Sequence, residues 1–219
     1  MISVVDIGAL YAASRQRICA LVLDAGEETA RNTAAQACPG WSVRDVVAHL
    51  VGVVEDGLAG RLTGPPDDTM TADEVDRHAH DTVQDMTSEW QRLAPTFEAV
   101  LTERQIWAAM IDVISHEHDI RTALGVAGAR SDVGVILAAQ RLAVIPDSPV
   151  AINVQEMAAT SQPTSNAAVT LTSAAFEIIR FRLGRRSIEQ VLELPWSADP
   201  TPYLADLFVF GPADQPLIE

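Results

Sequence analysis

A short stretch of this chain carries imidazole and carboxylate groups at a spacing that could bind a metal ion. In DVISHEHDIRTALG, residues 112–125, Asp112 and His116 are four residues apart and Asp119 follows three residues later. On a helix this spacing directs all three side chains to one face within two turns. An acid and a histidine four residues apart can reach one ion, and nitrogen and oxygen donors suit zinc or a similar divalent cation.

A further ligand is expected from a second helix. His49 lies near the end of CPGWSVRDVVAHL, residues 38–50, at the edge of an apolar helix face where neighbouring helices meet. Three protein ligands would leave a fourth coordination position for water or substrate, as in catalytic zinc sites. Asp119 or Glu117 would then orient one of the imidazoles. From spacing alone, an ordinary hydrogen-bonded or solvated role for these side chains stays open.

The elements that must position these residues are helices. Ser42 with Asp45 three residues later has the form of a capping box at the start of the second helix, and Thr71 with Glu74 repeats it before a polar, solvated third helix. Pro95 is expected to break or kink the chain before the fourth helix. Four long helices with short connections predict a bundle. The recurrence of apolar residues predicts these helices over 5–25, 42–62, 72–93 and 102–124.

The character of the sequence changes after residue 128. A short helical stretch at 132–145 precedes two runs typical of strands, 149–155 and 167–173, which predict a hairpin or two strands of a small sheet. Further helices are expected over 174–183 and 187–194. The fold is therefore expected to be mainly α. Its predicted domains are a metal-binding helical bundle over 1–128 and a small C-terminal α+β region over 129–219, packed on the bundle.

The remaining histidines and both cysteines have simpler interpretations. His118 points roughly opposite to His116 on the predicted helix, which favours an interface or surface position. His78 and His80 lie within the polar third helix and are expected to be solvated. Cys19 is expected in the core and Cys38 to pack at the edge of a loop.

Charge and motif content exclude several classes of function. Thirty acidic residues against fifteen basic ones give a formal net charge of -15, and the absence of a Lys/Arg run argues against nucleic acid or anionic membranes as partners. The N-terminal segment has neither a basic leader nor an uninterrupted apolar stretch, so a cytoplasmic location is expected. The sequence contains no GxSxG, glycine-rich phosphate loop or HExxH motif.

Several motifs together resemble a known family. CPGWSVRDVVAHL and DVISHEHDIRTALG, with FEIIRFRLGRRSIEQVLEL and the following PWSADPTPYLADLFVFGP, are similar to the mycothiol-dependent maleylpyruvate isomerase family, across nearly the whole chain. The resemblance implies a DinB-like four-helix bundle and a metal ion bound by His49, Asp112 and His116. One departure is that the characterised isomerases have a Glu at the acidic position, whereas Asp112 is shorter by one methylene.

The resemblance also implies an arginine from the C-terminal region that binds the substrate carboxylates. Arg185 or Arg186 could supply this catalytic group, since a guanidinium holds a carboxylate through two parallel hydrogen bonds. The alternative is that the GRRS turn fixes the end of a helix.

The function implied is that of a metal-dependent enzyme using a low-molecular-weight thiol, mycothiol, for isomerisation of or S-transfer to a small electrophile. The metal, expected to be zinc, would lower the pKa of the thiol so that the thiolate forms near neutral pH. Two alternatives remain: a metal-dependent hydrolase that activates water, and a non-catalytic metal- or ligand-binding module. The expected partners are a small-molecule substrate and the thiol, and the sequence leaves a homodimer open.

Overall fold

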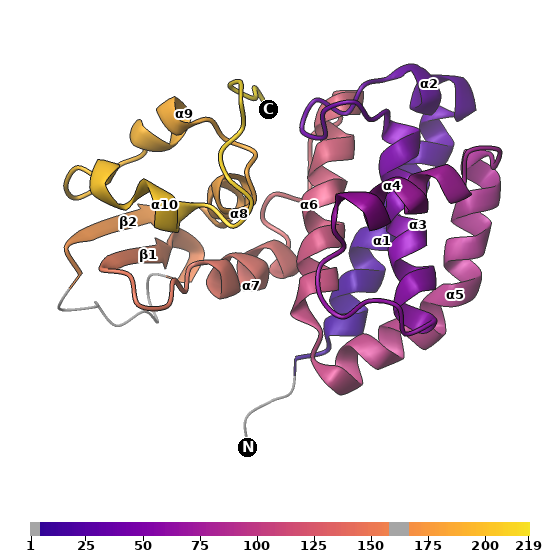
Figure 1. The fold of residues 1–219 in the computed structure, drawn as a ribbon, viewed down its shortest axis with the longest axis horizontal. Coiled ribbons are helices and arrows are strands. Elements are labelled where there is room, and N and C mark those ends of the chain that lie inside the picture. Colours follow the sequence, from indigo (N-terminus) through magenta and orange to yellow (C-terminus); the bar gives the residue numbers. More distant parts are fainter. Residues whose placement is uncertain (1–4, 158–166) are drawn as a thin grey trace. The chain divides into compact units, whose positions relative to one another are not determined.

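The computed structural model describes residues 5–157 and 167–219 and divides the chain into two compact units, Met1–Ala127 and Gly128–Glu219. The first unit is helical, and its four long helices, α1, α3, α5 and α6, form a bundle (Figure 1). Helix α1 packs against α5 and α6, and α3 packs against α5 and α6, while the short helices α2 and α4 lie against α3. The helices are α1 (Ile7–Ala25), α2 (Glu27–Asn32), α3 (Val43–Leu58), α4 (Asp68–Arg77), α5 (Val83–Arg104) and α6 (Trp107–Leu124).

Two capping boxes fix the starts of bundle helices. Ser42 accepts a hydrogen bond from the backbone N–H of Asp45, whose carboxylate in turn accepts from the Ser42 N–H, so α3 begins where the sequence predicts. Thr82 and Asp85 form the same arrangement at the start of α5. The start of α3 sets the position of His49, which lies in its second turn.

The single helix predicted over 72–93 is wrong, because the chain forms two helices, α4 and α5, joined by a short turn. Helix α4 begins after Asp67, whose side chain accepts a hydrogen bond from the Met70 N–H at 2.9 Å. The capping box predicted at Thr71 and Glu74 therefore does not form, since both residues lie inside α4. Glu74 is fully buried although the segment was expected to be largely solvated.

The break expected at Pro95 is absent, since this residue lies inside α5. Trp90 and Phe97 on either side of it are buried, and this packing outweighs the backbone hydrogen bond that proline cannot make. The helix ends instead at Gln105, which adopts a left-handed conformation with φ 53°. Helix α6 consequently begins at Trp107, later than the sequence predicts.

The bundle core combines apolar packing with one buried hydrogen bond. The indole N–H of Trp90 donates to the hydroxyl of Tyr11 at 3.0 Å, so both polar groups are satisfied inside the core. Tyr11 also packs edge to face on Phe97 with ring centroids 5.3 Å apart, a geometry that adds about 0.5–1.5 kcal/mol to the burial itself.

Helices α1 and α5 approach each other at Gly8. A Cβ atom built on Gly8 would lie 2.2 Å from the backbone oxygen of Glu98, which no real side chain tolerates. The Gly8 N–H donates to the side-chain oxygen of Thr102 at 2.8 Å. The close approach of these two helices therefore requires a residue without a side chain at this position.

The second unit contains a two-stranded sheet with helices. Strands β1 and β2 are parallel, with Val150 opposite Val169, so the hairpin that the sequence left open is excluded. Helix α7 packs against α8 and β1. The elements are α7 (Val133–Leu142), β1 (Val150–Val154), η1 (Gln155–Met157), β2 (Val169–Ser173), α8 (Ala175–Arg182), α9 (Ile188–Leu192), η2 (Thr201–Tyr203) and α10 (Leu204–Leu207).

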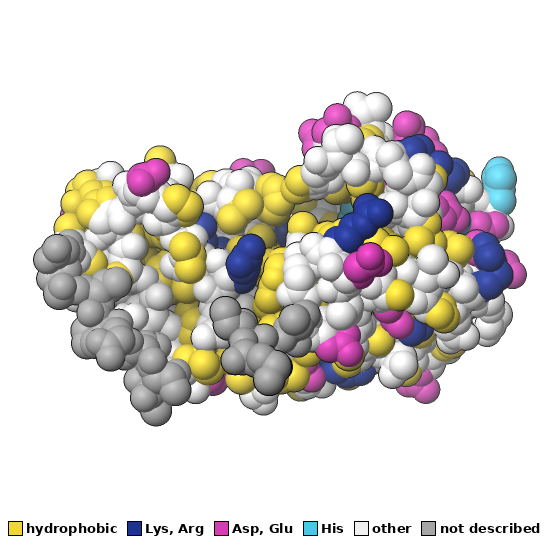
Figure 2. Space-filling model, turned by 90° about the horizontal axis from the view of Figure 1, so that it is seen from below, with side chains coloured by type: hydrophobic (Ala, Val, Ile, Leu, Met, Phe, Trp, Pro, Cys, Tyr) yellow, Lys and Arg dark blue, Asp and Glu magenta, His cyan; other side chains and the backbone are white. Residues whose placement is uncertain are grey.

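The surface is mixed in charge. On the face drawn in Figure 2, basic and acidic side chains are interspersed among polar and apolar ones and do not merge into one basic surface. None of the helices in residues 5–157 and 167–219 is both long enough and apolar enough to cross a membrane.

Candidate metal centre

The three residues predicted as metal ligands lie together in the bundle, and we refer to His49, Asp112 and His116 as the candidate metal centre. His49 projects from α3 toward α6, and its ring centroid lies 5.2 Å from that of His116. Asp112 lies one helical turn before His116, with Oδ1 3.4 Å from His116 Nε2 and Oδ2 3.7 Å from His49 Nε2. One donor atom of each residue lies within 4.8 Å of the other two.

These distances fit a divalent cation. A tetrahedral zinc ion with ligand bonds of about 2.0 Å separates its donor atoms by about 3.3 Å. One Asp112 oxygen lies 3.4 Å from His116 Nε2 and the other lies 3.7 Å from His49 Nε2, and one donor atom of each residue lies within 4.8 Å of the other two, so the three side chains must draw together to share one ion. The imidazole side chains are 5% and 8% exposed, whereas that of Asp112 is 35% exposed. The candidate metal centre is therefore closed on the histidine side and open on the aspartate side, where a fourth ligand could enter.

Each imidazole is held from behind by a buried carboxylate. Nδ1 of His49 lies 2.7 Å from Oε2 of Glu74 on α4, and Nδ1 of His116 lies 3.0 Å from Oδ2 of Asp119. Both carboxylate side chains are 0% exposed. Since the carboxylates contact Nδ1, the Nε2 atom of each ring is directed toward Asp112.

The sequence predicts only one of the two carboxylates that contact the imidazoles. Asp119 takes the orienting position expected of it, whereas Glu117, the other candidate, instead forms ion pairs with Arg17 at 2.8 Å and Arg121 at 2.9 Å. Sequence reasoning does not identify Glu74 as a neighbour of His49, because its spacing from Thr71 is also that of a helix cap. The one local signal was Gly52, a residue without a side chain on the buried surface of α3.

Negative charge dominates the electrostatics of the candidate metal centre. Burial would lower the pKa of His49, but hydrogen bonds with Asp112 and Glu74 outweigh burial and raise this pKa above its ordinary value. Burial acts in the same way on His116, and the charge of Asp112 with the hydrogen bonds to Asp112 and Asp119 leaves its pKa well raised. The cluster thus attracts positive charge, whether as protons or as a cation.

Cys38 lies closer to these residues than expected. Its Sγ atom is 3.5 Å from Oδ2 of Asp119 and 3.8 Å from Nδ1 of His116, and donors of these three residues also lie within 4.8 Å of one another. The thiol is partly buried and forms no disulfide. Sequence spacing could not reveal this contact, because Cys38 belongs to the loop before α3 whereas its neighbours belong to α6.

The other histidines and Cys19 divide between confirmed and wrong expectations. His118 is buried rather than at the surface. His78 is also buried, with Nδ1 2.8 Å from Oδ2 of Asp81, so the solvated position predicted for it is wrong. His80 is exposed and Cys19 buried, as predicted.

The two candidate arginines of the second unit have different surroundings. Arg186 is buried and forms ion pairs with Glu177 at 2.6 Å and Glu219 at 2.7 Å, so it holds this unit together. Arg185 is partly exposed, and its Nη1 donates to the backbone oxygen of Leu183 at 2.6 Å. Of the two, Arg185 is the one whose side chain reaches solvent more readily.

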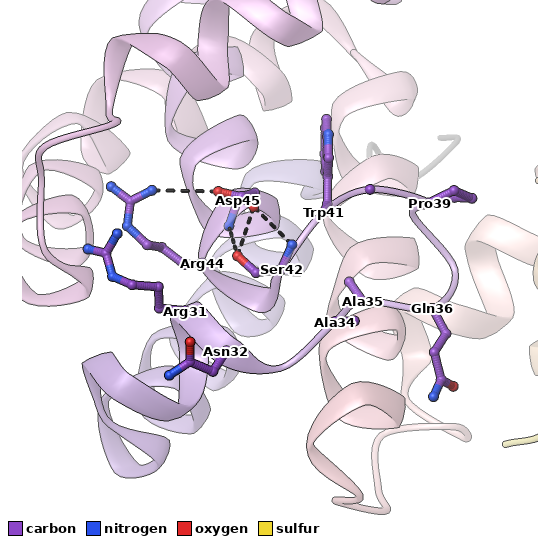
Figure 3. A pocket seen from close by; sticks show the side chains of 11 residues that line it. Arg31, Asn32, Ala34, Ala35, Gln36, Pro39, Trp41, Ser42, Arg44 and Asp45 are labelled. Atoms are coloured by element: carbon purple, nitrogen blue, oxygen red, sulfur yellow. Dashed lines mark hydrogen bonds and ion pairs between the residues drawn. The ribbon is translucent and has the colours of Figure 1, made fainter.

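A cavity of about 580 Å³ lies beside the start of α3 (Figure 3). It lies between the end of α2 and the start of α3, and Arg31, Trp41 and Arg44 are among the residues that line it. Trp41 rises from the loop before α3, and its ring centroid lies 5.3 Å from that of His49. One aromatic side chain thus borders both the cavity and a residue of the candidate metal centre.

Comparisons with known proteins find a matching family model and two similar folds. Residues 11–130 match the family model described as the mycothiol maleylpyruvate isomerase N-terminal domain. Two solved structures, the mycothiol-dependent maleylpyruvate isomerase and a point mutant of it, are similar in fold, with TM-scores of 0.52 and 0.56. Each shares 10% sequence identity with this chain and covers 84% of it and 90% of its own length. Among curated proteins, none matches this chain in sequence.

Proposed function

This chain belongs to the family of the mycothiol maleylpyruvate isomerase N-terminal domain, and from that membership we propose that it is a metal-dependent enzyme that uses mycothiol as a cosubstrate. The substrate class is a small electrophile, which the enzyme either isomerises or joins to the thiol sulfur. The observation that carries the proposal is the convergence of donor atoms from His49, Asp112 and His116 within 4.8 Å of one another.

The charge around these donors supports a divalent cation in particular. Three carboxylates, those of Glu74, Asp112 and Asp119, surround two imidazoles that must be neutral to coordinate a metal. Buried negative charge is costly unless a positive group compensates it. Oε1 of Glu74 is buried and has no hydrogen-bond partner in the described part of the chain, which leaves local charge for a cation to offset.

In the proposed mechanism the ion would be held by Nε2 of His49, Nε2 of His116 and a carboxylate oxygen of Asp112. The nitrogen and oxygen donors favour zinc as the divalent cation. The cation would lower the pKa of the bound thiol, so that the thiolate forms near neutral pH. The protein itself holds the ligands, directs the imidazoles through Glu74 and Asp119, and leaves the Asp112 side open to the thiol.

The thiol then acts as the nucleophile. Addition of sulfur to one carbon of a cis double bond removes the double bond and permits rotation, and expulsion of the thiol gives the trans isomer. A transferase would retain the adduct and protonate the neighbouring carbon. Arg185 is the residue we propose for binding a substrate carboxylate, because its side chain is partly exposed whereas that of Arg186 is buried.

The cavity beside Trp41 is where we expect the body of the thiol cosubstrate to bind. Its volume of about 580 Å³ is within the range of ligand sites, about 300–1,000 Å³. Trp41 lines this cavity and also packs against the His49 ring, with ring centroids 5.3 Å apart, and this contact links the cavity to the candidate metal centre. The unpaired thiols of Cys19 and Cys38 agree with the cytoplasmic location we propose.

Metal analysis of the purified protein followed by calorimetric titration with mycothiol is the first experiment. We expect about one zinc per chain and thiol binding that requires the metal, with a His49→Ala variant as the metal-free control. Tight metal binding without affinity for the thiol would overturn the proposed mechanism while leaving the metal centre intact.

A hydrolase is the second candidate, because the exposed side of Asp112 would also admit water to a bound ion. Zinc-loaded protein should be incubated with thiol and a cis-unsaturated dicarboxylate, and in parallel with ester and amide substrates. Turnover of the first set alone supports the thiol-dependent enzyme, and turnover of the second supports the hydrolase. Metal binding with no turnover of either set would support a non-catalytic binding module.

A further inference from the structure

The contact between α3 and α4 brings a carboxylate against the candidate metal centre. Gly52 follows His49 by three residues on α3, so the two lie on neighbouring parts of one helix face. A Cβ atom at Gly52 would lie 2.6 Å from Cβ and 2.7 Å from Cγ of Glu74. Because Gly52 has no side chain, α4 comes close enough for Glu74 to place Oε2 2.7 Å from Nδ1 of His49.

Burying the carboxylate of Glu74 in the interior of the bundle costs free energy. Its side chain is 0% exposed, and Oε1 has no hydrogen-bond partner among the described residues. The neighbouring Arg77 forms its ion pairs with Glu55 and Asp56 instead. An apolar side chain of similar size would fill this space without the cost of burying a charge. Packing therefore does not account for a carboxylate here, whereas its contact with His49 does.

We propose that Glu74 is a positioning residue that prepares His49 to bind the metal ion. By accepting a hydrogen bond from Nδ1–H, the carboxylate keeps the lone pair of the neutral ring on Nε2, the atom that faces Asp112. A carboxylate behind an imidazole also strengthens the ring as a donor. This inference rests on the proposed metal centre and adds to it a residue from α4.

The role of Glu74 parallels that of Asp119 behind His116, but the two carboxylates come from different places. Asp119 is three residues from the histidine it contacts, on the same helix, so its position follows from α6 alone. Glu74 is 25 residues from His49 and reaches it only because α4 packs on α3. The metal affinity of His49 is therefore coupled to the docking of α4.

The test is the zinc affinity of Glu74→Gln measured by competition with a chromophoric chelator. Gln has nearly the same shape but no charge, and its amide can donate to Nδ1 and so favour the tautomer that blocks Nε2. We expect zinc to bind about 10- to 100-fold more weakly than in the wild type. Glu103→Gln, an exposed change on α5, is the matched control and should leave the affinity unchanged.

Two further measurements separate positioning from folding. The thermal midpoint of metal-free Glu74→Gln reports the cost to folding, which should be a loss of stability because one partner of a buried pair is removed; zinc affinities are therefore compared at a temperature at which the variant is folded. Nitrogen NMR of the zinc-loaded wild type should show His49 protonated at Nδ1 and coordinated through Nε2, and Glu74→Asp should recover part of the lost affinity.

The outcomes distinguish this inference from the proposed function. If Glu74→Gln binds zinc within about twofold of the wild type, or loses affinity only as far as it unfolds, the positioning role is overturned and the metal centre stands. If the wild type binds zinc tightly but turns over no substrate, the proposed enzyme activity fails while the affinity data still decide the role of Glu74. If the wild type binds no zinc, both are overturned.

Discussion

His116 and Asp119 are joined by a contact of 3.0 Å between Nδ1 and Oδ2 within a single turn of α6. The same helix carries Asp112 one turn earlier, with Oδ1 3.4 Å from Nε2 of the His116 ring. The His116 imidazole thus lies between two carboxylates of its own helix, and both contacts that orient the ring come from α6. Only the second imidazole, His49, depends on the packing of α3 against α6.

Loss of either histidine of the candidate metal centre should abolish tight zinc binding. We expect His49→Ala and His116→Ala to weaken binding by more than the roughly 10- to 100-fold effect typical of residues outside the ligand shell. The matched control is His80→Ala, since that side chain is exposed and lies on the turn between α4 and α5. Equilibrium dialysis with zinc measures the effect, and full zinc retention in His49→Ala would contradict the ligand assignment.

Asp112 can be tested by changing its charge and its length separately. Asp112→Asn keeps the shape but removes the charge, and we expect zinc to bind at least about tenfold more weakly. Asp112→Glu keeps the charge and adds one methylene, and should retain or improve affinity. Chelator competition reports both values. Equal affinities in Asn and Glu variants would mean that this side chain does not coordinate the ion.

Asp119→Asn should weaken zinc binding by about 10- to 100-fold, because the orienting carboxylate of His116 is lost. Asp119 also contacts Sγ of Cys38 at 3.5 Å, so the effect of changing Cys38 can be compared with that of changing Asp119. Cys38→Ser preserves a polar group next to Asp119 and should change zinc affinity much less. A larger effect from Cys38→Ser than from Asp119→Asn would instead assign the thiol as a ligand.

The pH dependence of zinc binding follows from the raised pKa values of His49 and His116. Burial lowers them, but the surrounding carboxylates more than compensate. A folded-state pKa above the unfolded value of about 6.5 means that protonation stabilises the metal-free protein fully below about pH 6.5, and that this stabilisation is lost as the pH rises through the raised values.

Zinc requires the neutral imidazoles and must displace these protons. The increase in thermal midpoint caused by zinc should therefore grow between about pH 6 and about pH 8. Asp112→Asn, which removes one of the carboxylates that raise both values, should shift this increase to lower pH. A zinc effect that is constant over this range would contradict the raised pKa values.

The two arginines of the second unit should differ in the kind of defect they cause. Arg186→Ala breaks ion pairs with Glu177 and the buried Glu219 and should destabilise this unit by about 3 kcal/mol. Arg185→Ala should leave the denaturation midpoint unchanged and raise KM for a carboxylate substrate by about 10- to 100-fold, the effect of losing a charge-assisted hydrogen bond. Normal KM in Arg185→Ala would remove it as the substrate-binding residue.

The sequence predicted those features that depend on spacing along one helix. Asp112, His116 and Asp119 share a face of α6 whatever the rest of the fold does, so periodicity was sufficient to group them. The start of α3 followed from the reciprocal hydrogen bonds of Ser42 and Asp45, which are equally local.

Features set by tertiary packing could not be predicted in the same way. The Thr71 and Glu74 pair has the spacing of a cap, but Asp67 offers an equally good cap four residues earlier, and the buried position of Glu74 selects between them. The parallel pairing of β1 and β2 likewise depends on how the chain returns between them rather than on the strand residues. Cys38 reaches α6 only because its loop folds over it.

The glycines at helix contacts have a consequence for protein engineering. Replacing a helical glycine by alanine is a common way to increase stability, with an expected gain of about 0.5–1 kcal/mol. At Gly8 and Gly52 the added methyl group would overlap the neighbouring helix, so this strategy would separate α1 from α5 or α3 from α4. A thermostabilisation programme for this chain should leave both positions unchanged and choose its substitutions from the solvent-exposed helix faces.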